Sequence, residues 1–119
     1  MKDFRSVDVW KKSHGLVLAV YEASAVFPSS ELYGLTSQIR RAAASIPANV
    51  AEGCGRGSDR DFARFLQIAM GSASELEYHL ILARDLGFVN AVQHSSLEQA
   101  TIEVKRMLAG FIKKLKADG

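Results

Sequence analysis

The sequence predicts an all-α protein: one domain over residues 1–119, folded as an antiparallel, up-down-up-down four-helix bundle. Three observations lead to this prediction. Apolar residues return every three or four positions in four successive segments. No segment alternates apolar and polar residues as a half-buried strand would. The connections are short, and short connections favour antiparallel neighbours.

The first helix is expected over residues 7–27. Ser6 precedes it and can cap it, and Pro28 follows it and ends it. Its main apolar stripe consists of Leu16, Val20, Ala23 and Phe27, beside a second stripe of Trp10, Val17 and Tyr21. A face this wide can pack on two neighbouring helices.

The second helix is expected over residues 30–52, capped by Ser29 or Ser30. Its apolar stripe consists of Leu35, Ile39, Ala42 and Ile46. Pro47 follows within the same segment. Because a proline removes one backbone hydrogen bond and clashes with the preceding turn, we expect a kink or a break near Pro47.

The third helix is expected over residues 59–86, with Ser58 as its N-cap and Gly87 as a left-handed stop. Its apolar residues alternate in steps of four and three, as in a coiled-coil seam. The members of this seam are Phe62, Leu66, Ala69, Ala73, Leu76, Leu80 and Ala83. It is the clearest pattern in the sequence and predicts shallow crossings with the neighbouring helices.

The fourth helix is expected over residues 96–116. Ser95 and Glu98 have the spacing of a capping box at its beginning. The four-three alternation returns in Leu97, Thr101, Val104, Leu108, Phe111 and Leu115. This second seam predicts that the fourth helix packs lengthwise on the bundle.

Composition indicates a cytoplasmic globular protein without metal or cofactor. The net charge is +2, and Cys54 is the single cysteine, which fits a reducing compartment. Charges interrupt the amino terminus, so no signal peptide is expected, and no apolar run is long enough to span a membrane. The three histidines lack metal-ligand spacing. We expect His79 to be partly buried, and His14 and His94 to lie on the surface.

A polar ridge runs along the second helix beside its apolar stripe: Gln38, Arg41, Ser45, Asn49, Glu52 and Arg56. The third helix carries a mixed stripe with Ser72 and Glu75 at positions where a simple bundle has apolar residues. A carboxylate near a core needs a partner, and Arg41 and Arg64 are the candidates. The favoured interpretation is an ion-pair network that orders the bundle or joins subunits. The alternative is a small-molecule or anion pocket around Arg41, Glu52 and Glu75. We expect no catalytic centre, because no nucleophile accompanies the carboxylates.

Basic residues suggest a further alternative, an accessory protein that binds RNA or DNA. A ring of several copies would combine weak basic patches into a stronger field. The candidate contacts are Arg40, Arg41, Arg56, Arg60, Lys105, Arg106, Lys113, Lys114 and Lys116. The same carboxyl-terminal lysines also complement a helix dipole, which is the purely structural explanation.

Several sequence blocks carry a family resemblance. They are residues 35–42 (LTSQIRRA), 45–53 (SIPANVAEG), 55–56 (GR), 65–66 (FL), 68–69 (IA) and 71–76 (GSASEL). Phe4, Val9-Trp10 and Phe27-Pro28 agree with them. Together they resemble the bacterial 23S rRNA intervening-sequence protein family over nearly the whole chain. The family takes its name from proteins encoded in intervening sequences of large-subunit ribosomal RNA genes.

The resemblance implies a four-helix bundle that assembles into a ring-like homopentamer with a central channel and has no established enzymatic activity. A similar pentameric protein serves diversity-generating retroelements as an accessory factor that binds nucleic acid and the reverse transcriptase. The signature residues carried over by this resemblance are Gln38, Arg41, Ser45, Asn49, Glu52, Gly53, Arg56, Gly71, Ser72 and Glu75.

Overall fold

The computed structural model describes the chain from residue 3 to residue 118, apart from the side chain of residue 118. The first two residues and the last residue of the predicted domain lie outside this range. The described chain contains four α-helices and two short 3-10 helices and no strand, so the predicted all-α four-helix fold is confirmed. In chain order the elements are η1 (Phe4–Ser6), α1 (Asp8–Ser24), η2 (Ser29–Glu31), α2 (Leu35–Cys54), α3 (Asp59–Asp85) and α4 (Ala91–Asp118).

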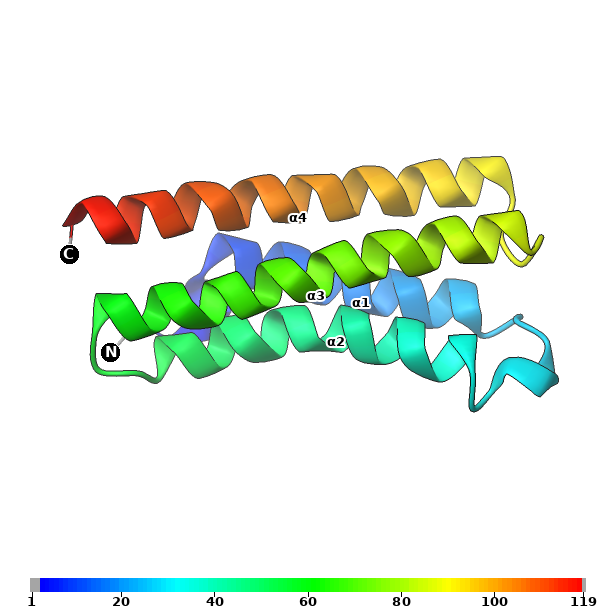
Figure 1. Cartoon of the computed structure of the whole chain (residues 1–119), viewed down its shortest axis with the longest axis horizontal. Coiled ribbons are helices and arrows are strands. Elements are labelled where there is room, and N and C mark those ends of the chain that lie inside the picture. The colour runs from blue at the N-terminus through cyan, green and yellow to red at the C-terminus, as the bar shows by residue number, and fades with distance from the viewer. Residues whose placement is uncertain (1–2, 119) are drawn as a thin grey trace.

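The helices pack around one long axis, and the molecule measures 45 × 23 × 20 Å. In Figure 1 successive helices run in opposite directions along this axis. α1 packs on α2 and α4, and α3 packs on the same two helices. α1 therefore lies diagonally across the bundle from α3, and the α2–α3 pair and the α1–α4 pair present two different faces to solvent.

The two predicted seams form the core of the bundle. In α3 every seam residue except Phe62 is buried, and Leu66, Ala69, Ala73 and Leu76 have no exposed surface. In α4 the seam is buried from Leu97 to Leu108, while Phe111 and Leu115 are half-buried. The half-buried Phe62 meets Phe111 edge-to-face, with 5.1 Å between ring centroids. The Phe62–Phe111 pair therefore covers the core at the end of the bundle where α3 begins and α4 ends.

The first two helices are shorter than predicted. Ser6 lies within η1 and donates its hydroxyl to the Asp3 carbonyl, so Val7 and not Ser6 is the N-cap of α1. At its other end α1 stops at Ser24, three residues before the predicted end. Ser29 and Ser30 belong to η2 and do not cap α2. α2 begins at Leu35, whose amide donates to the Glu31 carboxylate at 3.0 Å. A side chain one turn upstream therefore satisfies the first amide of α2, in a helix that begins later than the predicted serine caps imply.

Pro47 lies inside α2, which continues as an α-helix from Leu35 to Cys54. The predicted break at this proline is therefore wrong, whereas the kink stays a prediction. Ile46 and Val50, on either side of Pro47, are fully buried against the other helices. Their packing offsets the single backbone hydrogen bond that a proline removes.

Two local hydrogen-bond motifs shape the connection between α3 and α4. Gly87, at φ +79°, ends α3 as predicted: its amide donates to the Arg84 carbonyl, and the Phe88 amide donates to the Ala83 carbonyl. These two bonds make a Schellman motif. Asn90 then starts α4, five residues before the predicted cap. The Gln93 amide donates to Asn90 Oδ1 at 2.8 Å, and the Asn90 amide donates to Gln93 Oε1 at 3.0 Å. This reciprocal capping box replaces the predicted box of Ser95 and Glu98, which lies inside the helix.

Asn90→Ala is expected to lower the stability of the protein by about 1 kcal/mol, because it leaves an amide of the first turn of α4 without a partner. Ser95→Ala is the matched control, since Ser95 receives only a 3.4 Å bond from Gln99 on the solvent side. Urea unfolding followed by circular dichroism measures both variants. A larger loss with Ser95→Ala than with Asn90→Ala would contradict the cap observed here.

Candidate functional site

Part of the polar ridge of α2 and part of the mixed stripe of α3 border a hollow between the two helices. The hollow has a volume of about 600 Å³ and is open to solvent. Its walls are Gln38, Arg41, Ala42, Ala44, Ser45 and Ala48 from α2, and Ser72 and Glu75 from α3. Five of the predicted polar residues therefore meet there: Gln38, Arg41, Ser45, Ser72 and Glu75.

Serine hydroxyls join the two helices at the centre of the hollow. The Ser45 and Ser72 hydroxyl oxygens lie 2.8 Å apart and share a hydrogen bond. Asn49 Nδ2 donates to the Ser45 carbonyl at 2.8 Å and to the Ser45 hydroxyl at 3.0 Å. This network joins α2 to α3 and engages both serine hydroxyls and the Asn49 amide nitrogen within the chain, so these groups are less available to a ligand.

Glu75 has a different partner from the one predicted. His79 Nε2 lies 3.0 Å from Glu75 Oε2, one helical turn away. The His79 ring is buried, and its Nδ1 has no hydrogen-bond partner within residues 3–118. The Glu75 side chain itself is 55% exposed, so it is not the buried carboxylate that the sequence pattern indicated.

The other predicted charge partners also differ. Arg64 donates to Asp61 at 3.0 Å, one turn before it in α3, and does not reach Glu75 or Glu52. Glu52 lies 3.9 Å from Arg56 and outside the hollow. The proposed set of Arg41, Glu52 and Glu75 is therefore not assembled at one place, and a carboxylate pair for acid–base chemistry is absent from the hollow.

Arg41 is the one cationic wall of the hollow. In the described part of the chain it forms no hydrogen bond, ion pair or ring contact. Its neighbours in the wall are the short side chains of Ala42, Ala44 and Ala48. The sequence analysis did not predict Ala44 and Ala48 as part of the site. They follow Arg41 by three and seven residues, so helical spacing from Arg41 could have identified them.

Four of the nine basic residues predicted to bind nucleic acid have partners inside the chain. Arg40 donates to the Ser24 hydroxyl at 2.8 Å, and its guanidinium lies over the Tyr21 ring. Arg56 lies near the carboxylates of Glu52 and Asp61, and its guanidinium stacks over the Phe65 ring. Lys105 donates to Glu77 at 2.9 Å. Arg106 forms an ion pair with Glu103. These four residues connect or brace helices, which lowers their availability to a phosphate backbone.

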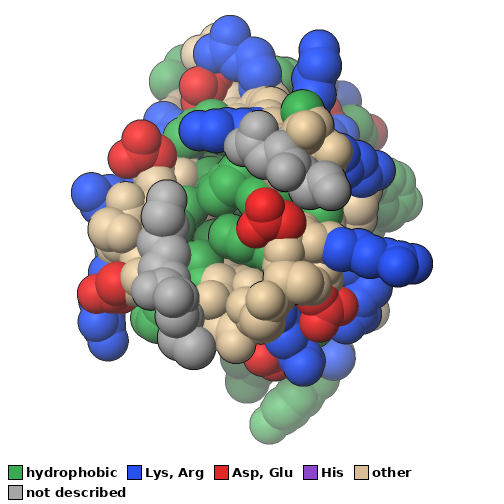
Figure 2. Space-filling model, turned by 90° about the vertical axis from the view of Figure 1, so that its left-hand side faces the viewer, with side chains coloured by type: hydrophobic (Ala, Val, Ile, Leu, Met, Phe, Trp, Pro, Cys, Tyr) green, Lys and Arg blue, Asp and Glu red, His purple; other side chains and the backbone are tan. Residues whose placement is uncertain are grey.

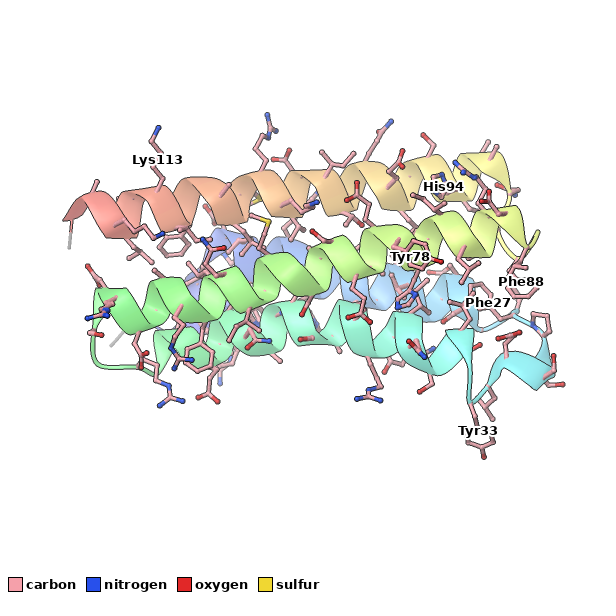
Figure 3. The ribbon with its side chains drawn as sticks, in the orientation of Figure 1. Phe27, Tyr33, Tyr78, Phe88, His94 and Lys113 are labelled. Atoms are coloured by element: carbon pink, nitrogen blue, oxygen red, sulfur yellow. The ribbon has the colours of Figure 1, made fainter. Side chains whose placement is uncertain are left out.

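The remaining cations gather at one end of the bundle. Arg60, Lys113, Lys114 and Lys116 make no ion pair among the described residues. Lys116 and Arg60 line a shallow depression of about 490 Å³ between α3 and α4. Figure 2 shows Lys and Arg side chains around the rim of this end, with acidic side chains between them, and Figure 3 shows Lys113 directed away from the bundle.

Three further observations concern metal binding, a buried histidine and the membrane. No group of three or more His, Cys, Asp or Glu side chains that could hold a metal ion occurs between residues 3 and 117. His94 was predicted to lie on the surface, but it is buried in the first turns of α4 (Figure 3). Its Nε2 lies 3.8 Å from the Glu98 carboxylate. It is buried because α4 begins five residues earlier than expected. None of the described helices is long and apolar enough to cross a membrane.

Comparisons with known proteins agree with this architecture. The model of the 23S rRNA-intervening sequence protein family matches residues 5–110. The structure is similar to a crystal structure from Bacteroides thetaiotaomicron VPI-5482, of a protein with unknown function from the S23 ribosomal protein family. The two share 27% identity at a TM-score of 0.82, over 88% of this chain and 95% of the other. No curated protein matches, and neither similarity indicates an enzyme family. The chain belongs to the 23S rRNA-intervening sequence protein family.

Proposed function

We propose that this protein is a cytoplasmic, non-enzymatic scaffold or binding module that works as a homo-oligomer, with a pentameric ring as the form that family resemblance implies. The observation that carries the proposal is the α2–α3 face. Three alanines and two serines form most of the wall of its hollow, beside Gln38, Glu75 and Arg41, and Arg41 has no partner among the described residues. Such a wall allows close approach of another helix, whereas a purely solvated face would carry long charged side chains.

Apolar side chains border this face. Ile68 is 43% exposed and lies four residues before Ser72 in α3, and Leu86, the C-cap of α3, is 51% exposed and continues the same helical spacing beyond Glu75. Leu82 lies between them in the stripe and is half-buried. Apolar residues around a recessed polar centre are typical of a surface that another protein covers.

The proposal is tested by measuring the mass of the purified protein in solution. Multi-angle light scattering or sedimentation equilibrium at micromolar concentration is expected to give a discrete multiple of the 13.0 kDa chain, five chains in the ring form. Ile68→Glu is expected to shift the mass toward the monomer, because it places a charge at the edge of the contact. Ile102→Glu, on the outer side of α4 and 49% exposed, is the control. A wild-type protein that remains a monomer would remove the proposal.

A second candidate function is binding of RNA or DNA at the end of the bundle. The observation in its favour is a group of cations that make no ion pair with any residue the structure describes: Arg60, Lys113, Lys114 and Lys116. A cyclic assembly repeats such a group around its axis and so strengthens the field that a polyanion meets.

Binding of a structured RNA or a DNA duplex at low salt is expected to weaken steeply as salt rises, because cationic contacts release counterions. The variant Lys113→Glu/Lys114→Glu is expected to abolish it. Arg106→Glu is the control, since Arg106 is already paired with Glu103. No electrophoretic shift of either nucleic acid at low salt would contradict this candidate.

A further inference from the structure

The outward face of α1 is unusual for a surface that meets only water. Gly15, Leu18, Ala19 and Glu22 succeed one another at helical spacing, and all four are exposed. Leu18 is 58% exposed, and a Cβ placed on Gly15 would have no neighbour within 4 Å. The helix thus presents one large apolar side chain between two small residues, followed one turn later by a carboxylate.

The carboxylate of this face has no partner between residues 3 and 117. Glu22 forms no side-chain hydrogen bond or ion pair within the described range of the chain. The same is true of Arg41 in the hollow between α2 and α3. One chain therefore carries an unpaired acid beside an exposed leucine on one side, and an unpaired base beside a hollow on another.

We propose that these two surfaces bind each other: α1 of one copy lies in the α2–α3 hollow of the next, with Leu18 between Ala44 and Ala48, and Glu22 paired with Arg41. The proposal rests on the self-assembly proposed above and names the surfaces that make it. The partner is a second copy of this chain, because both the apolar and the charged complement are present on the same molecule.

The register of the two faces supports the pairing. Glu22 lies one turn after Leu18 in α1, and Arg41 lies one turn before Ser45 in α2. A four-residue step spans about 6 Å in either helix. Leu18 can therefore enter the hollow while Glu22 reaches Arg41, provided that α1 of one copy runs antiparallel to α2 of the other. The hollow of about 600 Å³ exceeds one side chain and has room for a ridge of small residues beside Leu18.

The same direction fits a closed ring. α1 and α2 of one chain already run in opposite directions (Figure 1), so an antiparallel contact with the α2 of a neighbour leaves both bundles pointing the same way. Copies related by a cyclic axis all point the same way along that axis. The contact also joins two different surfaces, α1 and the α2–α3 face, as a heterologous contact in a ring requires.

A mixing experiment tests this assignment. Leu18→Arg removes the inserted residue and leaves the hollow intact, and Ala48→Arg fills the hollow and leaves α1 intact. Both positions are exposed, so both variants are expected to fold, which circular dichroism verifies. Each variant alone is expected to be a monomer by light scattering. Their mixture is expected to form a 1:1 dimer and nothing larger, because only one productive contact remains between the two. Ile102→Arg, equally bulky and on α4, is expected to assemble as the parent does.

A charge exchange tests the ion pair. Glu22→Arg and Arg41→Glu are each expected to weaken assembly by about tenfold or more, and the variant carrying both changes is expected to recover most of it. Lys113→Glu is the control for the change of charge alone.

The outcomes separate the two proposals. A monomeric wild-type protein would overturn both. A wild-type oligomer that persists in Leu18→Arg and Ala48→Arg would leave self-assembly standing and overturn this contact. A mixture of two monomeric variants that forms no dimer would overturn it as well.

Discussion

Leu76→Asp is expected to unfold the protein. Leu76 lies in the middle of the α3 seam and has no exposed surface. Removing the leucine side chain costs about 2–5 kcal/mol, and an unpaired buried carboxylate adds several more. The sum is comparable with the whole stability of a domain of this size, about 5–15 kcal/mol. The circular dichroism signal at 222 nm should therefore be largely lost at room temperature.

Ala73→Asp provides an independent check, because Ala73 is equally buried one turn earlier in the same seam. Ile102→Asp is the matched control, since Ile102 lies on the outer side of α4 and is 49% exposed. A Leu76→Asp protein that melts at the parent's temperature would show that the α3 seam is not the core of the bundle.

Gly53→Ala is expected to destabilise the protein although it introduces a better helix former. A Cβ at Gly53 would lie 2.7 Å from Phe62 Cδ1 and 3.1 Å from the Cβ of Phe65, which belongs to the opposite helix. Overpacking costs about 1–3 kcal/mol, which exceeds the gain of about 0.5–1 kcal/mol that alanine brings to a helix interior. The melting temperature should fall.

Gly110→Ala makes the same chemical change at a position in α4 where a Cβ would have no neighbour within 4 Å. Only the helix-forming gain remains there, so the melting temperature should rise. If the two substitutions shift the melting temperature in the same direction, the close approach of α2 and α3 at Gly53 does not limit the fold.

The helices could be predicted from sequence because burial follows periodicity. The steps of four and three from Leu66 to Leu80 identified residues that are fully or almost fully buried. The starts of α2 and α4 could not be found in this way. These starts depend on which polar side chain accepts a hydrogen bond from a free amide at the helix end. In this structure Glu31 and Asn90 accept these bonds, in place of the serines that were predicted as caps.

The candidate site was predicted in the same partial way. Helical spacing brought Arg41, Ser45 and Glu75 to one face, and the structure places them around one hollow. Their partners could not be predicted, because a partner depends on side-chain reach across and along helices. Glu75 bonds His79 within its own helix, whereas Arg41, the expected partner, stays without one in the described structure.

The end of the bundle that carries Arg60 and the carboxyl-terminal lysines gives the molecule an electrical polarity. Glu22, Glu31, Asp85 and Glu98 lie toward the opposite end, where α1 and α3 finish and α4 begins (Figure 1). The small net charge of +2 thus hides a lengthwise dipole. Copies that stand side by side around a cyclic axis would add these dipoles instead of cancelling them. One rim of such a ring would then attract polyanions while the other repels them, so the particle would have a direction even though all its subunits are identical.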